Sequence, residues 1–203
     1  MFLLIEWLNF FCLLVFALFM SMYLYVKSVG PAALEQKIGE QAYAKCAQYR
    51  QMSEVFGILG LAGYVVYYFY PLPVPIPTSF PIPYYMSVAI AVLILIPSGY
   101  LMYRGTTDAG EETATPKKEH TLYGGIYNTI RHPQMLGEVW TGFVLALFLN
   151  SPFLFLFSFF TFPLFYWAAV AEENDLIIRY GQPYIEYRER TGMFFPKKKE
   201  QTP

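Results

Sequence analysis

The chain has 203 residues, of which 56% are apolar, 20% are aromatic and 14% are charged. This composition excludes an intrinsically disordered chain and an ordinary water-soluble domain. Fourteen Lys and Arg against fifteen Asp and Glu leave a formal net charge of −1, so the total charge gives no indication of a nucleic-acid partner. We therefore predict an all-α, polytopic membrane protein.

The first apolar run, residues 2–26, contains a single charged residue, Glu6. At about 1.5 Å per residue it is long enough to cross a hydrocarbon layer of about 30 Å, so we predict the first transmembrane helix there. A cleaved signal peptide would begin with basic residues, whereas Lys27 comes after the run. Residues 31–52 mix charges with helix formers and predict an interfacial amphipathic helix within a cytoplasmic loop, residues 27–53.

Two further transmembrane helices are predicted on either side of a proline-rich linker. The second, residues 55–70, ends at a series of prolines between residues 71 and 83, which cannot continue a helix and favour an extended connection. The third, residues 84–103, contains Pro97, which we expect to kink the helix rather than end it, because neighbouring helices can satisfy the freed carbonyl. These three helices form a predicted N-terminal region, residues 1–103.

The remaining residues, 104–203, are predicted to form the catalytic region. Two apolar runs, residues 134–149 and 153–170, are separated by the turn signal Asn150-Ser151-Pro152. We predict that they are the fourth and fifth transmembrane helices and that they form a helical hairpin. The charged residues 171–203 would then form a cytoplasmic tail that is helical in two stretches.

All 14 basic residues fall on one side of this five-helix arrangement. That side holds the loop 27–53, the polar segment 104–133 and the C-terminal tail. Basic residues accumulate on the cytoplasmic side of membrane proteins, so we expect the N-terminus outside and the site and C-terminus in the cytoplasm. Removing one helix from the arrangement would scatter the basic residues over both sides, which supports the number five.

A first cluster of chemically capable residues precedes and enters the predicted fourth helix. It runs from residue 120 to residue 127 and continues with Arg131-His132-Pro133 and Glu138. A guanidinium beside the N-terminus of a helix suits a carboxylate or a phosphate. Glu138 lies about one turn inside an apolar helix, where a carboxyl group is costly unless it is paired, protonated or faces a polar cavity. A plainer interpretation is that Arg131 meets lipid head groups or forms an interfacial ion pair with Glu138.

A second cluster lies at the cytoplasmic end of the predicted fifth helix. Glu172 and Glu173 are adjacent acids near a helix C-terminus, where they oppose the helix dipole and so do not serve helix stability. They suit an ammonium group or ribose hydroxyls, and Tyr184 and Tyr187 supply aromatic walls that favour cations. The alternative is a solvated helix end with interfacial tyrosines.

The order and spacing of the two clusters are specific when taken together. The pattern reads Gly125-x-Tyr127-x3-Arg131-His132-Pro133-x3-Gly137, then, after an apolar hairpin, Glu172-Glu173-x2-Leu176-x3-Tyr180-Gly181-x2-Tyr184-x2-Tyr187 and Phe195-Pro196. This pattern resembles the isoprenylcysteine carboxyl methyltransferase and phospholipid methyltransferase superfamily. The sequence departs from the family pattern at Met135, where an aromatic residue is common, and in the stretch 120–125, which is one residue shorter.

The resemblance implies a small integral-membrane enzyme that binds S-adenosylmethionine and methylates a lipophilic acceptor from the bilayer, such as an isoprenylcysteine carboxylate or a phospholipid amine. Membrane lipids and a lipophilic or prenylated substrate are the expected partners. Arg131, Glu138 and Glu173 are the expected catalytic residues. The expected cofactor-binding residues are His120, Leu122, Gly125, Tyr127, Arg131, His132, Pro133, Glu172, Glu173 and Tyr184. With His120 and His132 as the only imidazoles, no metal is expected.

Two other classes of function remain open from the sequence. The residues Pro133-x3-Gly137-Glu138-x-Trp140-x-Gly142 resemble membrane sterol and steroid reductases, which bind NADPH and transfer hydride. The paired acids Glu172-Glu173 argue against a reductase. A non-catalytic membrane subunit is the third possibility, favoured if Arg131 and Glu173 face lipid head groups rather than each other.

Overall fold

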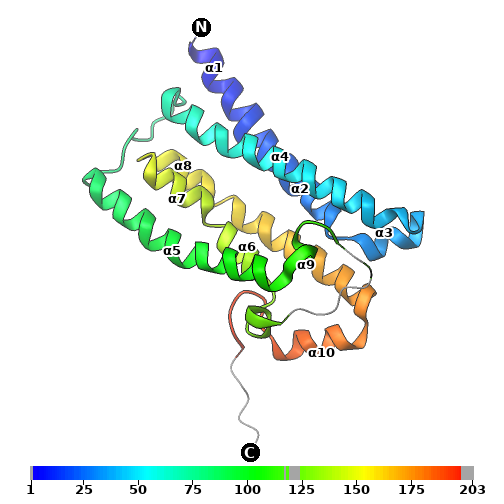
Figure 1. Cartoon of the computed structure of the whole chain (residues 1–203). Coiled ribbons are helices and arrows are strands. Elements are labelled where there is room, and N and C mark those ends of the chain that lie inside the picture. Colours follow the sequence, from blue (N-terminus) through cyan, green and yellow to red (C-terminus); the bar gives the residue numbers. More distant parts are fainter. Residues whose placement is uncertain (1, 117, 119–123, 198–203) are drawn as a thin grey trace, which may run out of the picture.

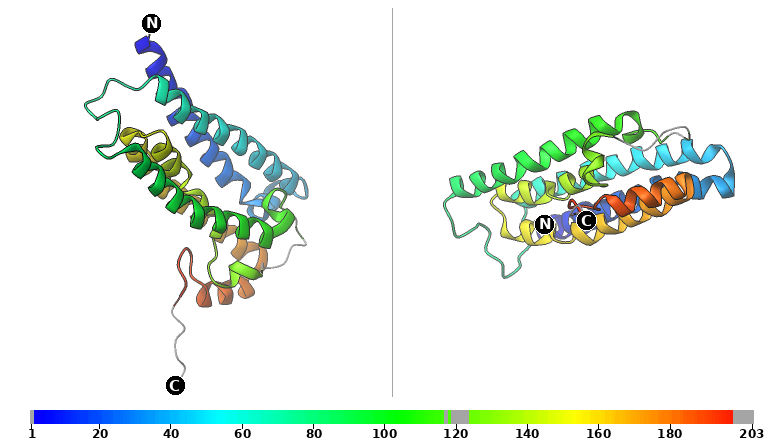
Figure 2. Two further views of the ribbon diagram at one scale, coloured as in Figure 1. Left: turned by 60° about the vertical axis from the view of Figure 1, so that its left-hand side comes forward. Right: turned by 90° about the horizontal axis from the view of Figure 1, so that it is seen from below.

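The computed structural model describes residues 2–116, 118 and 124–197, which form an all-helical bundle (Figure 1). Its helices in chain order are α1 (Phe2–Leu8), η1 (Asn9–Ala17), α2 (Leu18–Ser28), α3 (Pro31–Ile38), α4 (Gln41–Phe69), α5 (Tyr84–Ala109), η2 (Gly110–Thr113), η3 (Gly125–Asn128), α6 (Pro133–Glu138), α7 (Thr141–Phe148), α8 (Pro152–Ser158), α9 (Thr161–Tyr180) and α10 (Gln182–Arg190). The long helices run between two ends of the molecule. The N-terminus, the proline-rich linker and the α7–α8 turn lie at one end, and α3, η2, η3 and α10 lie at the other (Figures 1 and 2).

The first predicted helix is confirmed, because α1, η1 and α2 form one continuous helix. Its middle part, η1, is wound as a π-helix, and the backbone stays right-handed helical at both junctions. This helix packs along α4. At Gly63 of α4 a Cβ atom would lie 2.8 Å from Leu13 Cβ, so the close approach requires a glycine. Asn9 Nδ2 donates to the Gly63 carbonyl at 3.2 Å, and this hydrogen bond holds the two helices against each other.

The predicted interfacial helix over residues 31–52 is not one element. The short helix α3 ends at Gly39, whose φ of 71° is a left-handed conformation that favours glycine. From Gln41 onward the chain already belongs to α4, which is longer than the predicted second transmembrane helix. This first part of α4 buries side chains at three- and four-residue spacing, which include Cys46 and Arg50. Packing against α2 and α3 therefore extends the helix into the polar segment.

The third predicted helix is confirmed as α5, which continues through Pro97. It crosses α6 in backbone contact, since a Cβ atom on Gly137 would lie 2.5 Å from the Ser98 carbonyl oxygen. At the other end of this face, Ser87 Oγ donates to the Leu147 carbonyl at 2.7 Å. Contacts at both ends thus fix α5 against α6 and α7.

Residues 134–149 and 153–170 are each divided into two helices, in contrast to the two unbroken helices predicted. The first run forms α6 and α7, with a break at Val139 and Trp140, and the second forms α8 and the beginning of α9. Asn150 turns the chain between α7 and α8 with a φ of 52°, and these two helices pack together. The short helix α6 ends beside the polar end of the molecule and carries Glu138.

Four helical stretches in the described part of the chain are long and apolar enough to cross a membrane: Leu4–Ser28, Gln41–Phe69, Tyr84–Thr113 and Pro152–Tyr180. The predicted fourth helix is not among them, because α6 and α7 are both short. The all-helical prediction is therefore confirmed for the described residues, with four helices that could cross a membrane. The five-helix arrangement stays a prediction.

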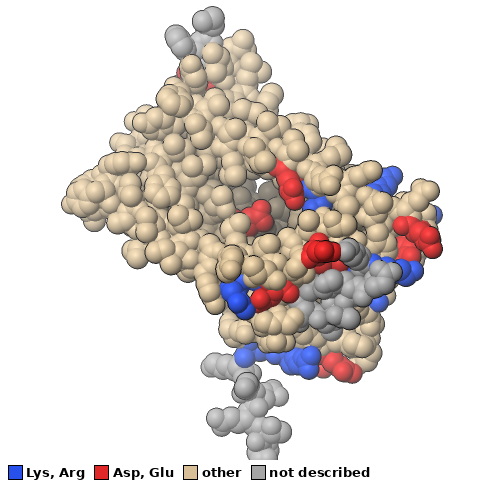
Figure 3. Space-filling view, viewed as in Figure 1, with Lys and Arg blue, Asp and Glu red and all other residues tan. Residues whose placement is uncertain are grey.

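The apolar and polar residues separate along the long axis of the bundle. Figure 3 shows a broad uncharged surface over one end and charged side chains gathered at the end that holds α3 and α10. The apolar core lies toward the uncharged end, where Tyr67 stacks on Phe153 with ring centroids 4.6 Å apart and packs with Leu14 and Leu154. The polar end is where α6, α9 and α10 meet.

Candidate active site

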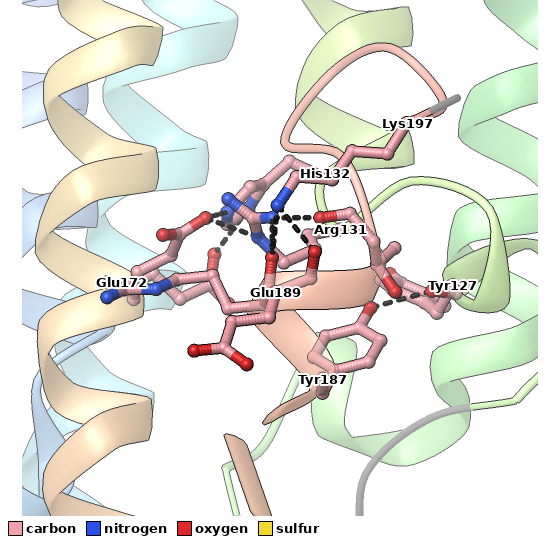
Figure 4. Close-up of polar contacts among 10 residues, drawn as sticks. Tyr127, Arg131, His132, Glu172, Tyr187, Glu189 and Lys197 are labelled. Atoms are coloured by element: carbon pink, nitrogen blue, oxygen red, sulfur yellow. Dashed lines mark hydrogen bonds and ion pairs between the residues drawn. The ribbon is translucent and has the colours of Figure 1, made fainter. Parts of the chain in front are cut away.

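Buried charged side chains form the centre of the site, at the N-terminus of α6 (Figure 4). Arg131 Nε donates to Glu173 Oε1 at 2.7 Å, and His132 Nε2 lies 3.1 Å from the same oxygen. The other ring nitrogen of His132, Nδ1, lies 3.4 Å from Glu172 Oε2. Because the side chains of Arg131 and Glu173 are each 8% exposed, their burial requires this pairing.

The network joins the two sequence clusters, which lie about forty residues apart in the chain. Arg131 pairs with Glu173 and forms no ion pair with Glu138, the partner that the plainer interpretation of the sequence gave it. The direct Arg131–Glu173 contact also removes the condition that favoured a non-catalytic subunit, in which each of these side chains would face lipid head groups. The acids of α9 are thus buried partners of a basic pair.

His132 is held between two carboxylates. Burial by itself lowers the pKa of His132, but hydrogen bonds and charges from Glu172 and Glu173 outweigh burial and raise the pKa above its ordinary value. The imidazole therefore keeps its proton to higher pH than a free histidine does. With His132 protonated, two positive and two negative charges balance within the network.

Arg131 also forms hydrogen bonds with the chain that follows Tyr187, and these hold that segment against the site. Its Nη1 donates to the carbonyls of Arg188, at 3.1 Å, and Thr191. The backbone N–H of Arg131 donates to the Gly192 carbonyl at 2.9 Å, within an isolated parallel bridge. We call residues 191–197 the C-terminal strap. Lys197 Nζ in turn donates to the Arg188 carbonyl at 3.0 Å, so the strap and the end of α10 are held together (Figure 4).

Three tyrosines form an aromatic wall beside the charged network. Tyr187 donates its hydroxyl to the Tyr127 carbonyl at 2.7 Å (Figure 4). The Tyr127 hydroxyl donates to the Gly105 carbonyl at 3.1 Å. Tyr184 packs on Tyr187 and is 1% exposed, and its hydroxyl has no hydrogen-bond partner among the described residues. Burial raises the pKa of Tyr127 and Tyr184, so both phenols remain neutral. A buried hydroxyl without a partner is costly, which makes Tyr184 available to a ligand.

The charged network and the tyrosine wall surround a small cavity. Its volume is about 60 Å³, and His132, Glu172 and Tyr184 line it together with Tyr25 of α2 and Arg50 of α4. Ligand sites commonly measure about 300–1,000 Å³. A ligand of nucleoside size therefore needs the walls to separate, and α10 forms one of those walls through Tyr184 and Tyr187.

Residues 86–183 match the family model for phospholipid methyltransferase. This region belongs to that family. The match confirms the resemblance to the isoprenylcysteine and phospholipid methyltransferase superfamily that the sequence pattern indicated. Neither a curated protein nor a solved structure matches the chain. The phospholipid methyltransferase region begins in α5 and ends at the start of α10, so it contains Arg131, His132, Glu172 and Glu173.

Two residues that precede the phospholipid methyltransferase region in the chain also line the small cavity, and sequence reasoning missed both of them. Arg50 is 9% exposed, and its Nη1 donates to the carbonyls of Glu112, at 2.7 Å, and Thr113, at 2.9 Å. Tyr25 lies beside Arg50, whose guanidinium carbon is 5.8 Å from the centroid of the Tyr25 ring. The available signal was that Arg50 follows Cys46 by one helical turn on a face of otherwise small residues.

Of the other residues expected at the cofactor site, Gly125 and Pro133 have clear structural roles. Gly125 has a φ of 61°, and a Cβ atom there would collide with the Asp108 carboxylate. That carboxylate accepts the Ile126 N–H at 2.8 Å and so holds η3 on α5. Pro133 occupies the first turn of α6, where its missing N–H leaves no hydrogen bond unmade. His120 and Leu122 lie outside the described residues.

Glu138 is not part of the charged network. It ends α6, and its side chain is exposed to a second, larger cavity beside the first. The structure thus brings Arg131, His132, Glu172 and Glu173 together and places Glu138 separately. The phospholipid methyltransferase region therefore contributes acidic groups to two adjoining spaces.

Proposed function

We propose that the protein is an S-adenosylmethionine-dependent methyltransferase that acts within the membrane on a lipophilic acceptor, either an isoprenylcysteine-type carboxylate or a phospholipid amine. One observation carries the proposal: the buried network of Arg131, His132, Glu172 and Glu173 lies inside the region that belongs to the phospholipid methyltransferase family. The family supports a membrane methyltransferase in general terms.

The side chains around the small cavity suit this cofactor. Glu172, with 24% of its side chain exposed, is the more accessible of the two acids and suits an ammonium group. The unpartnered hydroxyl of Tyr184 offers a hydrogen bond, and the neighbouring rings offer a surface for a purine. When bound, S-adenosylmethionine supplies a methyl group activated by its sulfonium. The proposed cofactor-binding residues are His120, Leu122, Gly125, Tyr127, Arg131, His132, Pro133, Glu172, Glu173 and Tyr184.

The residues expected to be catalytic divide into two roles in this proposal. Arg131 and Glu173 are positioning residues, because their polar atoms already hold His132, α10 and the strap. Glu138, which faces the larger cavity, accepts a proton where the acceptor is an amine. Most of the acceleration then comes from holding the acceptor in line with the methyl group while water is excluded.

For the membrane arrangement we propose five crossings, with α6 and α7 as a short fourth crossing that forms a hairpin with α8 and α9. The N-terminus would lie outside, and the site and the C-terminus in the cytoplasm. Support comes from the charged side chains that gather at the end of the molecule opposite the proline-rich linker (Figure 3). Single cysteines at Ser79 and Glu189 test this topology. An impermeant thiol reagent added to intact cells should label only the cysteine at position 79, and the reverse pattern would overturn the orientation.

Isothermal titration in detergent tests the proposed cofactor. We expect S-adenosylhomocysteine to bind and NADPH to give no heat. Glu172→Gln should weaken S-adenosylhomocysteine binding about tenfold, because it removes a charge-assisted hydrogen bond. Glu189→Gln, at an exposed site on α10, is the matched control and should bind like the unmodified protein. Binding of NADPH alone would support a reductase, and binding of neither ligand would support a non-catalytic subunit.

A further inference from the structure

The small cavity and the larger cavity share part of their walls. The larger one has a volume of about 490 Å³ and lies between α2, α4, α5, α6 and α9. Figure 3 shows a hollow between α4 and α5 with acidic side chains at its edge. Tyr25, Arg50, Thr113 and Gln134 line both cavities, so the two spaces meet at these residues. Arg50 is the charged one of the four, and its charge therefore acts on a ligand in either space.

The guanidinium of Arg50 is buried among neutral groups. The residue is 9% exposed, and its Nη1 donates to the backbone carbonyls of Glu112 and Thr113. Its Nε donates to Ser28 Oγ at 3.4 Å, and the ring of Tyr25 lies against the guanidinium. Its Nη2 has no hydrogen-bond partner within the described residues. A donor of a buried cation is thus left for a ligand at the place where the two cavities meet.

Arg50 also differs in charge balance from the other charged side chains that line the small cavity. Each of those lies within ion-pair distance of a partner: Glu112 of Arg179 at 2.6 Å, Arg131 of Glu173 at 2.7 Å, and His132 of Glu172 at 3.4 Å. Arg50 has no such partner within the described part of the chain. A buried charge without a counter-charge is costly. The small cavity therefore has one uncompensated positive charge, which suits an oxyanion.

We propose that Arg50 binds the carboxylate of the amino-acid part of the cofactor. The inference rests on the proposed binding of S-adenosylmethionine and adds a binding residue to it. The ammonium and the carboxylate of an α-amino acid are attached to the same carbon atom, so they need an acid and a base that lie close together. Glu172 and Arg50 line the same small cavity and supply this pair.

Two observations favour Arg50 and the cofactor over other combinations of base and oxyanion. The charge of Arg131, the guanidinium that the sequence associated with a carboxylate, is already balanced by Glu173. The phosphate of a lipid in the larger cavity would meet Glu54 and Glu138, which repel an anion. Because Arg50 belongs to α4 and lies outside residues 86–183, the family region alone does not complete the site.

The test compares ligands with and without the carboxylate by isothermal titration in one detergent. The ligands are S-adenosylhomocysteine and its decarboxylated analogue. Arg50→Gln removes the charge and keeps an amide N–H for the carbonyls of η2, whereas Arg50→Lys keeps the charge. Arg190→Gln, which removes an exposed guanidinium that lines neither cavity, is the matched control. Native mass spectrometry measures the binding of dodecyl phosphate to the same proteins, and denaturant titration checks that each variant is folded.

We expect the unmodified protein to bind S-adenosylhomocysteine about tenfold more tightly than the decarboxylated analogue, because one charge-assisted hydrogen bond separates the two ligands. Arg50→Gln should remove this preference by weakening S-adenosylhomocysteine alone, and Arg50→Lys should retain most of it. The Arg190→Gln control should bind both ligands like the unmodified protein. If Arg50→Gln does not fold, the preference measured in the unmodified protein and in Arg50→Lys still decides.

Three results would contradict the inference in different ways. Equal affinity of the unmodified protein for the two ligands would overturn it. Equal weakening of both ligands by Arg50→Gln would also overturn it, and would leave Arg50 only the role of holding η2. Loss of dodecyl phosphate binding in Arg50→Gln, with S-adenosylhomocysteine binding unchanged, would assign the guanidinium to a lipid phosphate instead. If neither nucleoside binds to the unmodified protein, the proposed function itself is wrong.

Discussion

The acidic residues around the two adjoining cavities differ in burial and in ion pairing. Around the small cavity, Glu173 is buried and pairs with both Arg131 and His132. In the larger one, Glu54 and Glu138 are exposed and make no ion pair within the described residues. Paired buried charges fix geometry at a cost in desolvation, whereas unpaired exposed charges leave potential available to a ligand. The difference separates a network whose charges hold one another in place from a cavity whose carboxylates have no ion-pair partner among the described residues.

The charged groups around the two cavities should also contribute differently to the unfolding free energy. Removing one member of the buried network leaves its partners charged and desolvated, so the fold should respond strongly. Removing a carboxylate from the larger cavity takes away a repulsion and leaves no partner behind. Substitutions in the two cavities should therefore differ in unfolding free energy even where both change activity.

The largest expected effect comes from Glu173→Ala. This variant leaves Arg131 and His132 buried without their shared carboxylate, and breaking a buried pair costs about 3–5 kcal/mol. Denaturant titration in a fixed detergent measures the loss. Glu189→Ala, at an exposed position on α10, is the control and should change the unfolding free energy by less than about 0.5 kcal/mol. Equal stability of the two variants would contradict the pairing.

A second effect tests how η3 is fastened beside the small cavity. Gly125→Ala places a Cβ atom against the Asp108 carboxylate in a left-handed conformation, and should cost about 1–3 kcal/mol. The neighbouring Gly124→Ala is a matched control, since a Cβ atom there meets nothing within 4 Å and its φ is −104°. The same denaturant titration compares them. A tolerated Gly125→Ala would mean that η3 can move away from α5 without loss.

The charged network should also make stability depend on pH. His132 has a raised pKa in the folded protein, so the contribution of its protonated form is fully present below the unfolded pKa of about 6.5 and is lost as pH rises through the folded pKa. Unfolding free energy should therefore fall with rising pH above about 6.5, by at most about 1.4 kcal/mol per pH unit. His132→Asn should remove this slope. A slope that persists in the variant would assign it to another group.

The sequence alone predicted the main helices and the meeting of the two clusters. The spacing around Arg131 and Glu173 carried a family pattern that placed both residues at one site, and the structure shows that they are in direct contact. The role of Arg50 could not be predicted, because it depends on how α4 packs against η2. The breaks inside the two apolar runs lie beside residues that weaken a helix, Gly137 and Gly142 at the first and Pro163 at the second, but tertiary packing decides that the helices end there.

Glu138 shows the limit of reasoning from one chain segment. An acid one turn inside an apolar helix indicates function, and the sequence suggested Arg131 as a structural partner. Sequence spacing places both residues near the start of one helix, but Arg131 is drawn to α9 and the strap instead. Glu138 is then left facing α4, whose acid Glu54 no family pattern marks. The pairing of charges across helices decides which acid is free.

The smallest expected effect sharpens the contrast between the cavities. Glu54→Gln and Glu138→Gln should each leave the unfolding free energy within about 0.5 kcal/mol of the unmodified protein, since each removes an exposed charge without an ion-pair partner among the described residues. Because the two carboxylates repel each other, the small change should be toward greater stability. Denaturant titration at pH 7.5, where both carboxylates would otherwise repel most, measures it. A loss above about 2 kcal/mol would show that one of these acids holds the fold together, and the two cavities would then no longer differ in kind.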